Sequence, residues 1–384
     1  MSYKIEEKIY TQRELMAFLA EYPLEEVNSL RAGLVEEGYF CNNVLALKVL
    51  ICENLRTGAL LLSGGAGTGK TSLAKALARL YKVRLFRLDC FKNITSKEAL
   101  YYFDENLQNF RRQMLLARRP EASEDEINEA YFSLKNIRWG PLGRAYVEEL
   151  EDCFVLINEI DKIPAEEGFE AGILTYIDEM KFLIPELDLE ISPRTKRNPL
   201  IIITSNAGTK HGGSSKDGDT GSGKVLSYPL QRRSTSMILD NPNMARIYQI
   251  ISETCRSLHP TVVKHIILYI ARLGFIRRSN DSSSRDLPIN LSNSRLEKEI
   301  GTSEVIDWAK GLEWLYDKYS GRLPHDLLLP EFVALTVERL AKTESDQNTL
   351  SAGLTDDIRQ VHEAKWDADE DLEKLHKEDR GEFI

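Results

Sequence analysis

The stretch Gly64-Gly65-Ala66-Gly67-Thr68-Gly69-Lys70-Thr71 decides the fold of this chain. It matches the pattern G-x-x-x-x-G-K-[ST], in which a glycine-rich loop wraps around phosphate groups. The apolar run Leu60–Leu62 before it predicts the end of a buried strand, and the run Ser72–Leu80 after it predicts a helix. Strand, glycine loop and helix in this order are what phosphate binding by backbone N–H groups requires.

The residue types in this stretch indicate a binding site for ATP and Mg²⁺. Glycines let the backbone come close to phosphate oxygens, and the following helix adds its positive N-terminal end. We expect Lys70 to reach the β- and γ-phosphates and the Thr71 hydroxyl to ligate Mg²⁺. The whole stretch, together with Ser72, is the expected nucleotide site. The alternative, a glycine-rich turn without a ligand, is disfavoured by the Lys-Thr pair and by both flanks.

Composition is ordinary for a globular protein: of 384 residues, 42% are hydrophobic and 29% are charged. No apolar run approaches the length of a membrane span, and the N-terminal residues are too polar for a signal peptide. The five cysteines are scattered without C-x-x-C spacing. Reduced thiols and a cytoplasmic location are therefore expected, with no membrane partner.

The net charge of −10 is concentrated in the C-terminal segment. From Glu344 to Ile384 there are thirteen acidic and five basic residues, a net −8, so the rest of the chain is close to neutral. Basic residues form only local clusters, such as Arg111 with Arg112. The absence of a broad basic face argues against nucleic acid as a partner.

Strand-like and helical runs alternate, which predicts a parallel sheet covered by helices, with the active site at the carboxyl ends of the strands. Met180–Ile191 is expected to form a short surface hairpin. The polar segment after Glu344 suggests a linker, with one further helix at Asp356–His376. Mobile loops are expected at Gly208–Lys224 and Arg277–Arg295. The expected strands are Gly58–Leu62, Val83–Leu88, Cys153–Ile157, Leu200–Thr204 and Met237–Leu239, and the expected helices of a small bundle are Met244–Ser257, Thr261–Leu273, Ser303–Tyr319 and Pro330–Lys342.

A second apolar run, Phe154–Ile157, ends in polar residues and resembles the Walker B motif, four apolar residues followed by Asp-Glu. Here Asn158 takes the place of the metal-holding Asp; it can accept a hydrogen bond from a metal-bound water but carries no charge. Glu159 is the expected group that orients or deprotonates the attacking water. Asp161 is a possible substitute anion, although a turn or helix-cap role is favoured for it.

Two further polar positions follow. Asn206 ends the Leu200–Thr204 strand run and could hold the attacking water or the γ-phosphate, although Asn after a strand is also common in turns. Arg232 and Arg233 precede the last strand run and could form a solvated edge. We favour the alternative, in which they face the nucleotide of a neighbouring subunit as an arginine finger.

From residue 35 to 343 the chain resembles the AAA+ ATPases, and within them the MoxR family and its CoxD-like branch. The set of stretches is specific although most members alone are not: Glu37-Gly38-Tyr39, Leu85–Cys90, Ile94-Thr95, Gly140-Pro141-Leu142, Leu183–Glu186, Thr204-Ser205-Asn206, Leu230–Arg233 and Val305–Ala309. The departures are Asn158 and Ser303, the latter at the place of the sensor 2 arginine.

The resemblance implies an α/β P-loop NTPase (AAA+) with a small all-α lid domain. It implies the nucleotide-binding domain at 35–242 and the lid at 243–343. Apolar residues at helical spacing predict an N-terminal helical extension at 1–34, and the charge count predicts an acidic tail at 344–384. The resemblance also implies an ATPase that assembles as a ring, commonly a hexamer, and remodels or activates a client, often with a von Willebrand factor A (VWA) protein. The alternative is an assembly scaffold gated by nucleotide, with weak or no hydrolysis because of Asn158.

Overall fold

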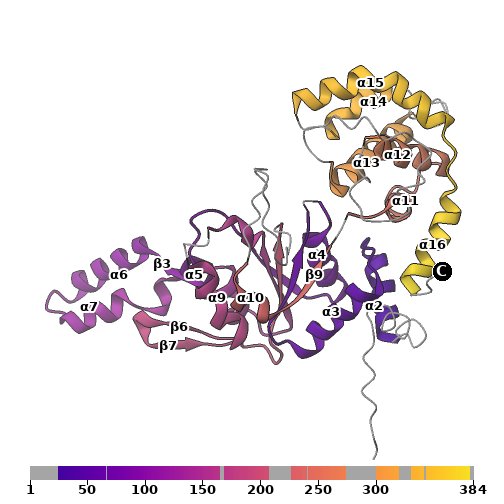
Figure 1. The fold of residues 1–384 in the computed structure, drawn as a ribbon. Coiled ribbons are helices and arrows are strands. Elements are labelled where there is room, and N and C mark those ends of the chain that lie inside the picture. Colours follow the sequence, from indigo (N-terminus) through magenta and orange to yellow (C-terminus); the bar gives the residue numbers. More distant parts are fainter. Residues whose placement is uncertain are drawn as a thin grey trace, which may run out of the picture. The chain divides into compact units, whose positions relative to one another are not determined.

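The computed structural model describes residues 25–65, 67–164, 168–206, 226–239, 241–273, 300–319, 330–340 and 343–380 (Figure 1). The chain forms two compact units. The described residues of Lys48–Gly65 and Lys70–Leu239 make up an α/β unit. Those of Met1–Leu47, Ala66–Gly69 and Asp240–Ile384 make up a second unit, whose regular elements are all helices.

A parallel five-stranded sheet in the order β2-β5-β8-β1-β9 is the centre of the α/β unit. Strands β1, β5 and β8 are buried along their whole length, as expected for apolar runs in a sheet covered on both faces. The strands are β1 (Ala59–Ser63), β2 (Arg84–Asp89), β5 (Cys153–Asn158), β8 (Leu200–Ser205) and β9 (Ser234–Ile238). Each overlaps an expected run, so the predicted α/β P-loop fold with a parallel sheet is confirmed.

Helices cover the sheet on both faces. Side chains alternate between the two faces along each strand, and in the central strands both sets are mostly apolar and buried. Leu61, Val155 and Ile201 share one core with Tyr146 and Tyr176, which lie on α8 and α9. Helix α4 packs against β2, β5 and β8. The helices near the sheet are α3 (Asn43–Leu55), α4 (Lys70–Leu80), α5 (Ser96–Leu100), α8 (Pro141–Val147), α9 (Phe169–Asp178) and α10 (Tyr228–Arg232), with a 3-10 turn η2 (Ile160–Lys162) after β5.

Two small antiparallel ribbons are added to this unit. The predicted hairpin at Met180–Ile191 is confirmed: β6 (Phe182–Ile184) pairs with β7 (Leu189–Ile191) across the 3-10 turn η4 (Pro185–Leu187). The other ribbon pairs β3 (Tyr101–Phe103) with β4 (Ile137–Trp139). Between its strands the chain forms α6 (Glu105–Arg118), α7 (Glu124–Tyr131) and the 3-10 turn η1 (Leu134–Asn136), and Figure 1 shows α6 and α7 projecting away from the sheet.

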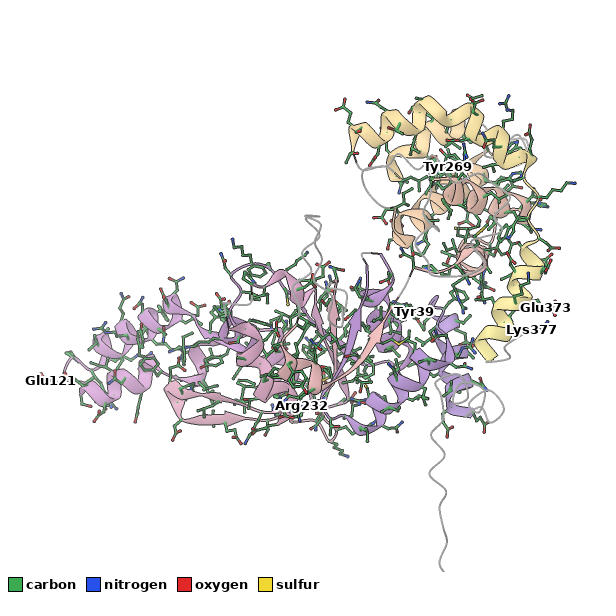
Figure 2. The ribbon with its side chains drawn as sticks, viewed as in Figure 1. Tyr39, Glu121, Arg232, Tyr269, Glu373 and Lys377 are labelled. Carbon is green, nitrogen blue, oxygen red and sulfur yellow. The ribbon has the colours of Figure 1, made fainter. Side chains whose placement is uncertain are left out.

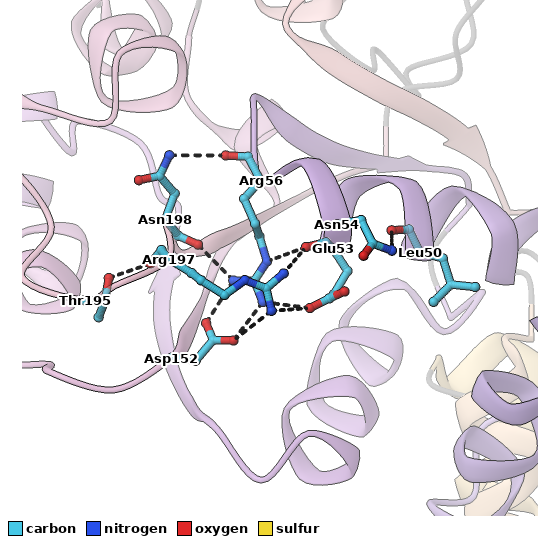
Figure 3. Close-up of polar contacts among 8 residues, drawn as sticks. All are labelled: Leu50, Glu53, Asn54, Arg56, Asp152, Thr195, Arg197 and Asn198. Carbon is cyan, nitrogen blue, oxygen red and sulfur yellow. Dashed lines mark hydrogen bonds and ion pairs between the residues drawn. The ribbon is translucent and has the colours of Figure 1, made fainter. Parts of the chain in front are cut away.

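A cluster of charged side chains fastens the amino-terminal edge of the sheet (Figure 3). The buried Arg56 guanidinium, at the end of α3, donates to both carboxylate oxygens of Asp152 at 2.9 Å. It also donates to the carbonyl of Asn198 at 2.9 Å and to Glu53 Oε1 at 3.2 Å. Asp152 directly precedes β5 and Asn198 lies just before β8, so this cluster joins α3 to both central strands.

The helical unit is built around Tyr269, which is labelled in Figure 2, and Trp308. The centroids of their rings lie 5.5 Å apart. The four bundle helices expected between Met244 and Lys342 are present. The helices of this unit are α2 (Glu25–Glu36), α11 (Met244–Thr254), α12 (Pro260–Arg272), α13 (Thr302–Lys318), α14 (Pro330–Thr336) with the 3-10 turn η7 (Val337–Arg339), α15 (Glu344–Glu363) and α16 (Ala368–Arg380).

The expectation of a polar linker after Glu344 is wrong. Helix α15 begins at Glu344 itself, and the expected single helix at Asp356–His376 is divided between α15 and α16. Leu350, Leu354, Ile358 and Val361 are buried in the core of the helical unit. The sequence obscured this stripe because its few apolar residues are separated by acidic and polar ones.

Several expectations lie outside the described residues: the fold of residues 1–24, the loops Gly208–Lys224 and Arg277–Arg295, and the loop residue Ala66. Among the helices that the structure describes, none combines the length and the apolar character needed to cross a bilayer.

Candidate active site

The glycine loop lies between β1 and α4, as the sequence predicts. Gly64 has φ 146°, and a Cβ at this position would lie 2.1 Å from the carbonyl oxygen of Leu239, so only glycine fits. Gly67 and Gly69 also have positive φ, at 79° and 89°. Because α4 begins at Lys70, the loop ends at a helix N-terminus, where unsatisfied backbone N–H groups attract anions.

Lys70 is held inside the loop. Its side chain is 6% exposed, and Nζ donates to the carbonyl oxygens of Gly64 at 2.9 Å and Gly65 at 2.6 Å. Burial lowers the pKa of the Lys70 ammonium, and the nearby carboxylates of Asp161 and Glu159 oppose that shift. Burial destabilises the charged form of Lys70, and an anionic ligand would stabilise it. This is consistent with the expected role of Lys70 in binding phosphate.

Thr71, Asn158 and Asp89 form a chain of hydrogen bonds across three elements. The Thr71 hydroxyl, on α4, donates to Asn158 Oδ1 at 2.7 Å. Asn158 ends β5, and its Nδ2 donates to Asp89 Oδ1 at 2.8 Å, at the end of β2. Thr204 of β8 donates its hydroxyl to the same Asn158 oxygen at 3.0 Å. The structure thus brings the two predicted metal residues together and places the Asp89 carboxylate beside them.

Glu159 follows Asn158 in a left-handed backbone conformation, with φ 57° and ψ 52°. Its N–H donates to Thr204 Oγ1 at 2.9 Å, which fixes the turn to the neighbouring strand. Its carboxylate lies 2.5 Å from Lys162 Nζ. The predicted general base therefore stands at the same edge of the sheet as the glycine loop, in a salt bridge with a lysine of its own turn.

Asn206 lies at this edge too, directly after β8. Its backbone N–H donates to Asp161 Oδ1 at 2.8 Å, so Asp161 joins the turn after β5 to the end of β8. This contact is consistent with a structural role for Asp161 in the turn, which the sequence analysis favoured over a role in binding metal.

Arg232 and Arg233 lie at the opposite edge of the sheet. Strand β9 runs parallel to β1 and begins at Ser234, opposite Ala59, so the residue before it stands at the amino-terminal edge. Arg233 Nε donates to Asp178 Oδ2 at 2.8 Å. The Arg232 guanidinium lies over the ring of Tyr228, 5.7 Å from its centroid. The structure does not bring either arginine to the glycine loop of its own chain.

Thr68 and Ser72 are the remaining described residues of the predicted nucleotide site. Thr68 precedes Gly69, and Ser72 is exposed in the first turn of α4. The aromatic ring of Tyr39, from the stretch that resembles the lead-in to the loop, lies 3.4 Å from where a Cβ on Gly69 would be. Burial raises the pKa of the Tyr39 phenol.

The donor set at this edge fits Mg²⁺, a hard ion that prefers oxygen ligands and retains several waters. The Thr71 hydroxyl, the Asn158 amide oxygen and the Asp89 carboxylate are oxygens of this kind. Sequence reasoning missed Asp89. Asp89 could have been found from its position, directly after the expected strand Val83–Leu88. Since the carboxyl ends of parallel strands meet at one edge of the sheet, an acid there lies near the nucleotide site.

Residues 60–210 match the sequence model of the AAA family, described as ATPases associated with various cellular activities. The matched region runs from β1 past the end of β8, and so includes the glycine loop, Asn158, Glu159 and Asn206. No curated protein matches the chain. The match supports an AAA+ ATPase and a general ATPase activity for this domain.

Proposed function

We propose that this chain is a MoxR-like AAA+ ATPase that couples hydrolysis of ATP to the remodelling or activation of a client protein. The observation that carries the proposal is the meeting of the glycine loop with the strand ends that bear Asn158, Glu159 and Asn206, inside a region that matches the AAA family. The ring, commonly a hexamer in that family, and a VWA-domain partner are inferred from the resemblance. The cytoplasmic location is inferred from the scattered cysteines.

The proposed roles follow from the chemistry of each side chain. Lys70 and the loop N–H groups bind the phosphates. Thr71 and Asn158 would hold Mg²⁺ through their side-chain oxygens. Bound Mg²⁺ would neutralise phosphate charge. Glu159 accepts a proton from the attacking water, and Asn206 donates a hydrogen bond to the γ-phosphate. Arg233, with Arg232, comes from the neighbouring subunit and stabilises charge on the transferred phosphate.

Replacing Lys70 tests the nucleotide site. Lys70→Ala should weaken ATP binding by at least about tenfold, the loss expected when a charged hydrogen-bond donor is removed from its ligand. Lys75→Ala, an exposed lysine later on the same helix, is the matched control and should bind as the unchanged protein does. Calorimetric titration with ATP and Mg²⁺ measures both affinities. Equal affinities for the two variants would remove the site assignment.

A second candidate function is an assembly scaffold that binds ATP without using it. Two observations favour it: Asn158 carries no charge, and the Glu159 carboxylate is paired with Lys162 at 2.5 Å. Phosphate release over many turnovers separates the candidates. Sustained release that Glu159→Gln abolishes identifies the ATPase, and assembly that depends on ATP without release identifies the scaffold.

A further inference from the structure

The end of β2 carries a carboxylate that no motif assigns. Asp89 is directly opposite Asn158 in the register of the β2–β5 pair, and both are the last residues of their strands. Residues in register on neighbouring parallel strands extend from the same face of a sheet. The Asp89 carboxylate is therefore placed against the one position of the motif where an acid is missing.

The hydrogen bonds fix which way the Asn158 amide points. A carboxylate only accepts hydrogen bonds, so the Asn158 NH₂ group must face Asp89. That leaves Asn158 Oδ1 toward Thr71 and Thr204, whose hydroxyls both donate to it. An acid at 158 would instead set two carboxylates against each other at this distance, which is unfavourable for both. The amide at 158 and the acid at 89 are thus complementary.

The other carboxylates at this edge have partners elsewhere. Glu159 is paired with Lys162, and Asp161 accepts the N–H of Asn206. Asp89 is bonded directly to Asn158 and is 59% exposed, so metal-bound water can reach it. Arg87 also donates to Asp89, and both of its contacts go to Oδ1, at 2.9 and 2.6 Å. Among the described residues, no hydrogen bond is made to Asp89 Oδ2.

We propose that Asp89 supplies the carboxylate of the magnesium site, in place of the acid that is absent at position 158. The negative charge lies at the end of β2 rather than at the end of β5, and the Asn158 amide connects it by hydrogen bonds to the Thr71 hydroxyl. Asp89 acts on the waters of the ion rather than on the phosphates. The inference rests on the proposed nucleotide site and specifies where its charge comes from.

The test measures metal affinity rather than turnover. Mn²⁺, detected by its electron paramagnetic resonance, is titrated into protein saturated with a non-hydrolysable ATP analogue. Asp89→Asn should weaken Mn²⁺ binding by about tenfold or more, the usual effect of removing a partner of a metal ligand. Glu190→Gln is the matched control, because Glu190 is equally exposed at 59% and is also paired with a cation, Lys181. It should leave Mn²⁺ affinity within about twofold.

The reciprocal exchange tests whether charge is what matters. The double variant Asp89→Asn with Asn158→Asp keeps one acid and one amide in the pair and should recover most of the Mn²⁺ affinity. Equal Mn²⁺ affinity in Asp89→Asn and Glu190→Gln would overturn the proposal, as would a folded double variant that stays as weak as Asp89→Asn. If the double variant does not fold, the comparison of the two single variants decides.

A separate measurement distinguishes this proposal from the proposed function. Binding of the ATP analogue in the presence of a metal chelator should be unchanged in Asp89→Asn. If the unaltered protein binds no nucleotide, the proposed function fails; if it binds nucleotide and Asp89→Asn leaves Mn²⁺ affinity intact, only the role of Asp89 fails.

Discussion

At the scale of single residues, the backbone of Glu159 shows how the site is held. Its φ of 57° is a conformation that costs a residue with a side chain about 1 kcal/mol or more. The N–H bond to Thr204 Oγ1 and the buried end of β5 hold it there. Because Glu159 has left-handed rather than extended backbone angles, its side chain does not have to alternate in direction with that of Asn158, as it would in a strand.

Two substitutions at this position separate strain from charge. Glu159→Gly and Glu159→Ala both remove the carboxylate and its salt bridge, but only glycine adopts positive φ freely. We expect Glu159→Gly to be more stable than Glu159→Ala by about 1 kcal/mol, and neither to hydrolyse ATP. Urea unfolding of the two variants measures the difference. If alanine proved the more stable residue here, the turn would not be strained as described.

At the scale of elements, α15 shows how a polar stretch becomes part of a core. Leu350, Leu354, Ile358 and Val361 recur at helical spacing and are all buried. Arg272 of α12 donates to Asp357 Oδ1 at 2.9 Å, next to this stripe. Acidic residues therefore lie on both sides of this packed helix: Glu344, Asp356 and Glu363 are exposed, whereas Asp346 is buried and Asp357 pairs with Arg272.

Shortening one side chain of the stripe measures that packing. Ile358 is 3% exposed. Ile358→Ala should lower the free energy of unfolding by about 2–4 kcal/mol, because the shorter side chain leaves a cavity and loses packing contacts. Leu335→Ala is the control, since Leu335 is 74% exposed. Hydrogen exchange in α12 and α15 should speed up in Ile358→Ala alone. Unchanged exchange would mean that α15 is not part of this core in solution.

At the scale of the whole molecule, the placement of Arg233 bears on assembly. It stands at the amino-terminal edge of the sheet, whereas the glycine loop lies at the carboxyl edge. An arginine that acts on phosphate from there acts on another subunit. Its contact with Asp178 is half exposed and can exchange for a partner at little cost.

Mixing two inactive variants tests action between subunits. Arg233→Ala should spare ATP binding and lower turnover steeply; arginine fingers are worth on the order of 10³ or more in rate, and a smaller loss is expected here because Asn158 is uncharged. Glu159→Gln should also be inactive. When the two are mixed, some interfaces join an intact Glu159 to an intact Arg233, and activity should partly return. A mixture that stays inactive while its subunits exchange would place Arg233 within its own subunit or exclude the ring.

The sequence by itself determined the features that depend on neighbouring residues. Strand, glycine loop and helix lie within one short stretch, and the apolar runs that form β1, β5 and β8 are continuous. Local sterics and burial are enough to specify such elements, so the loop, the parallel sheet, the β6–β7 hairpin and the four bundle helices could all be predicted.

Only the tertiary structure decided which distant residues meet. Asn158 bonds to Thr71 across 87 positions and to Asp89 across 69, and no periodicity in the chain encodes those pairs. They follow from the strand order β2-β5-β8-β1-β9, which places β2 beside β5 and so sets Asp89 opposite Asn158. The burial of α15 was decided in the same way, because a sparse apolar stripe becomes a core face only when α12 lies against it.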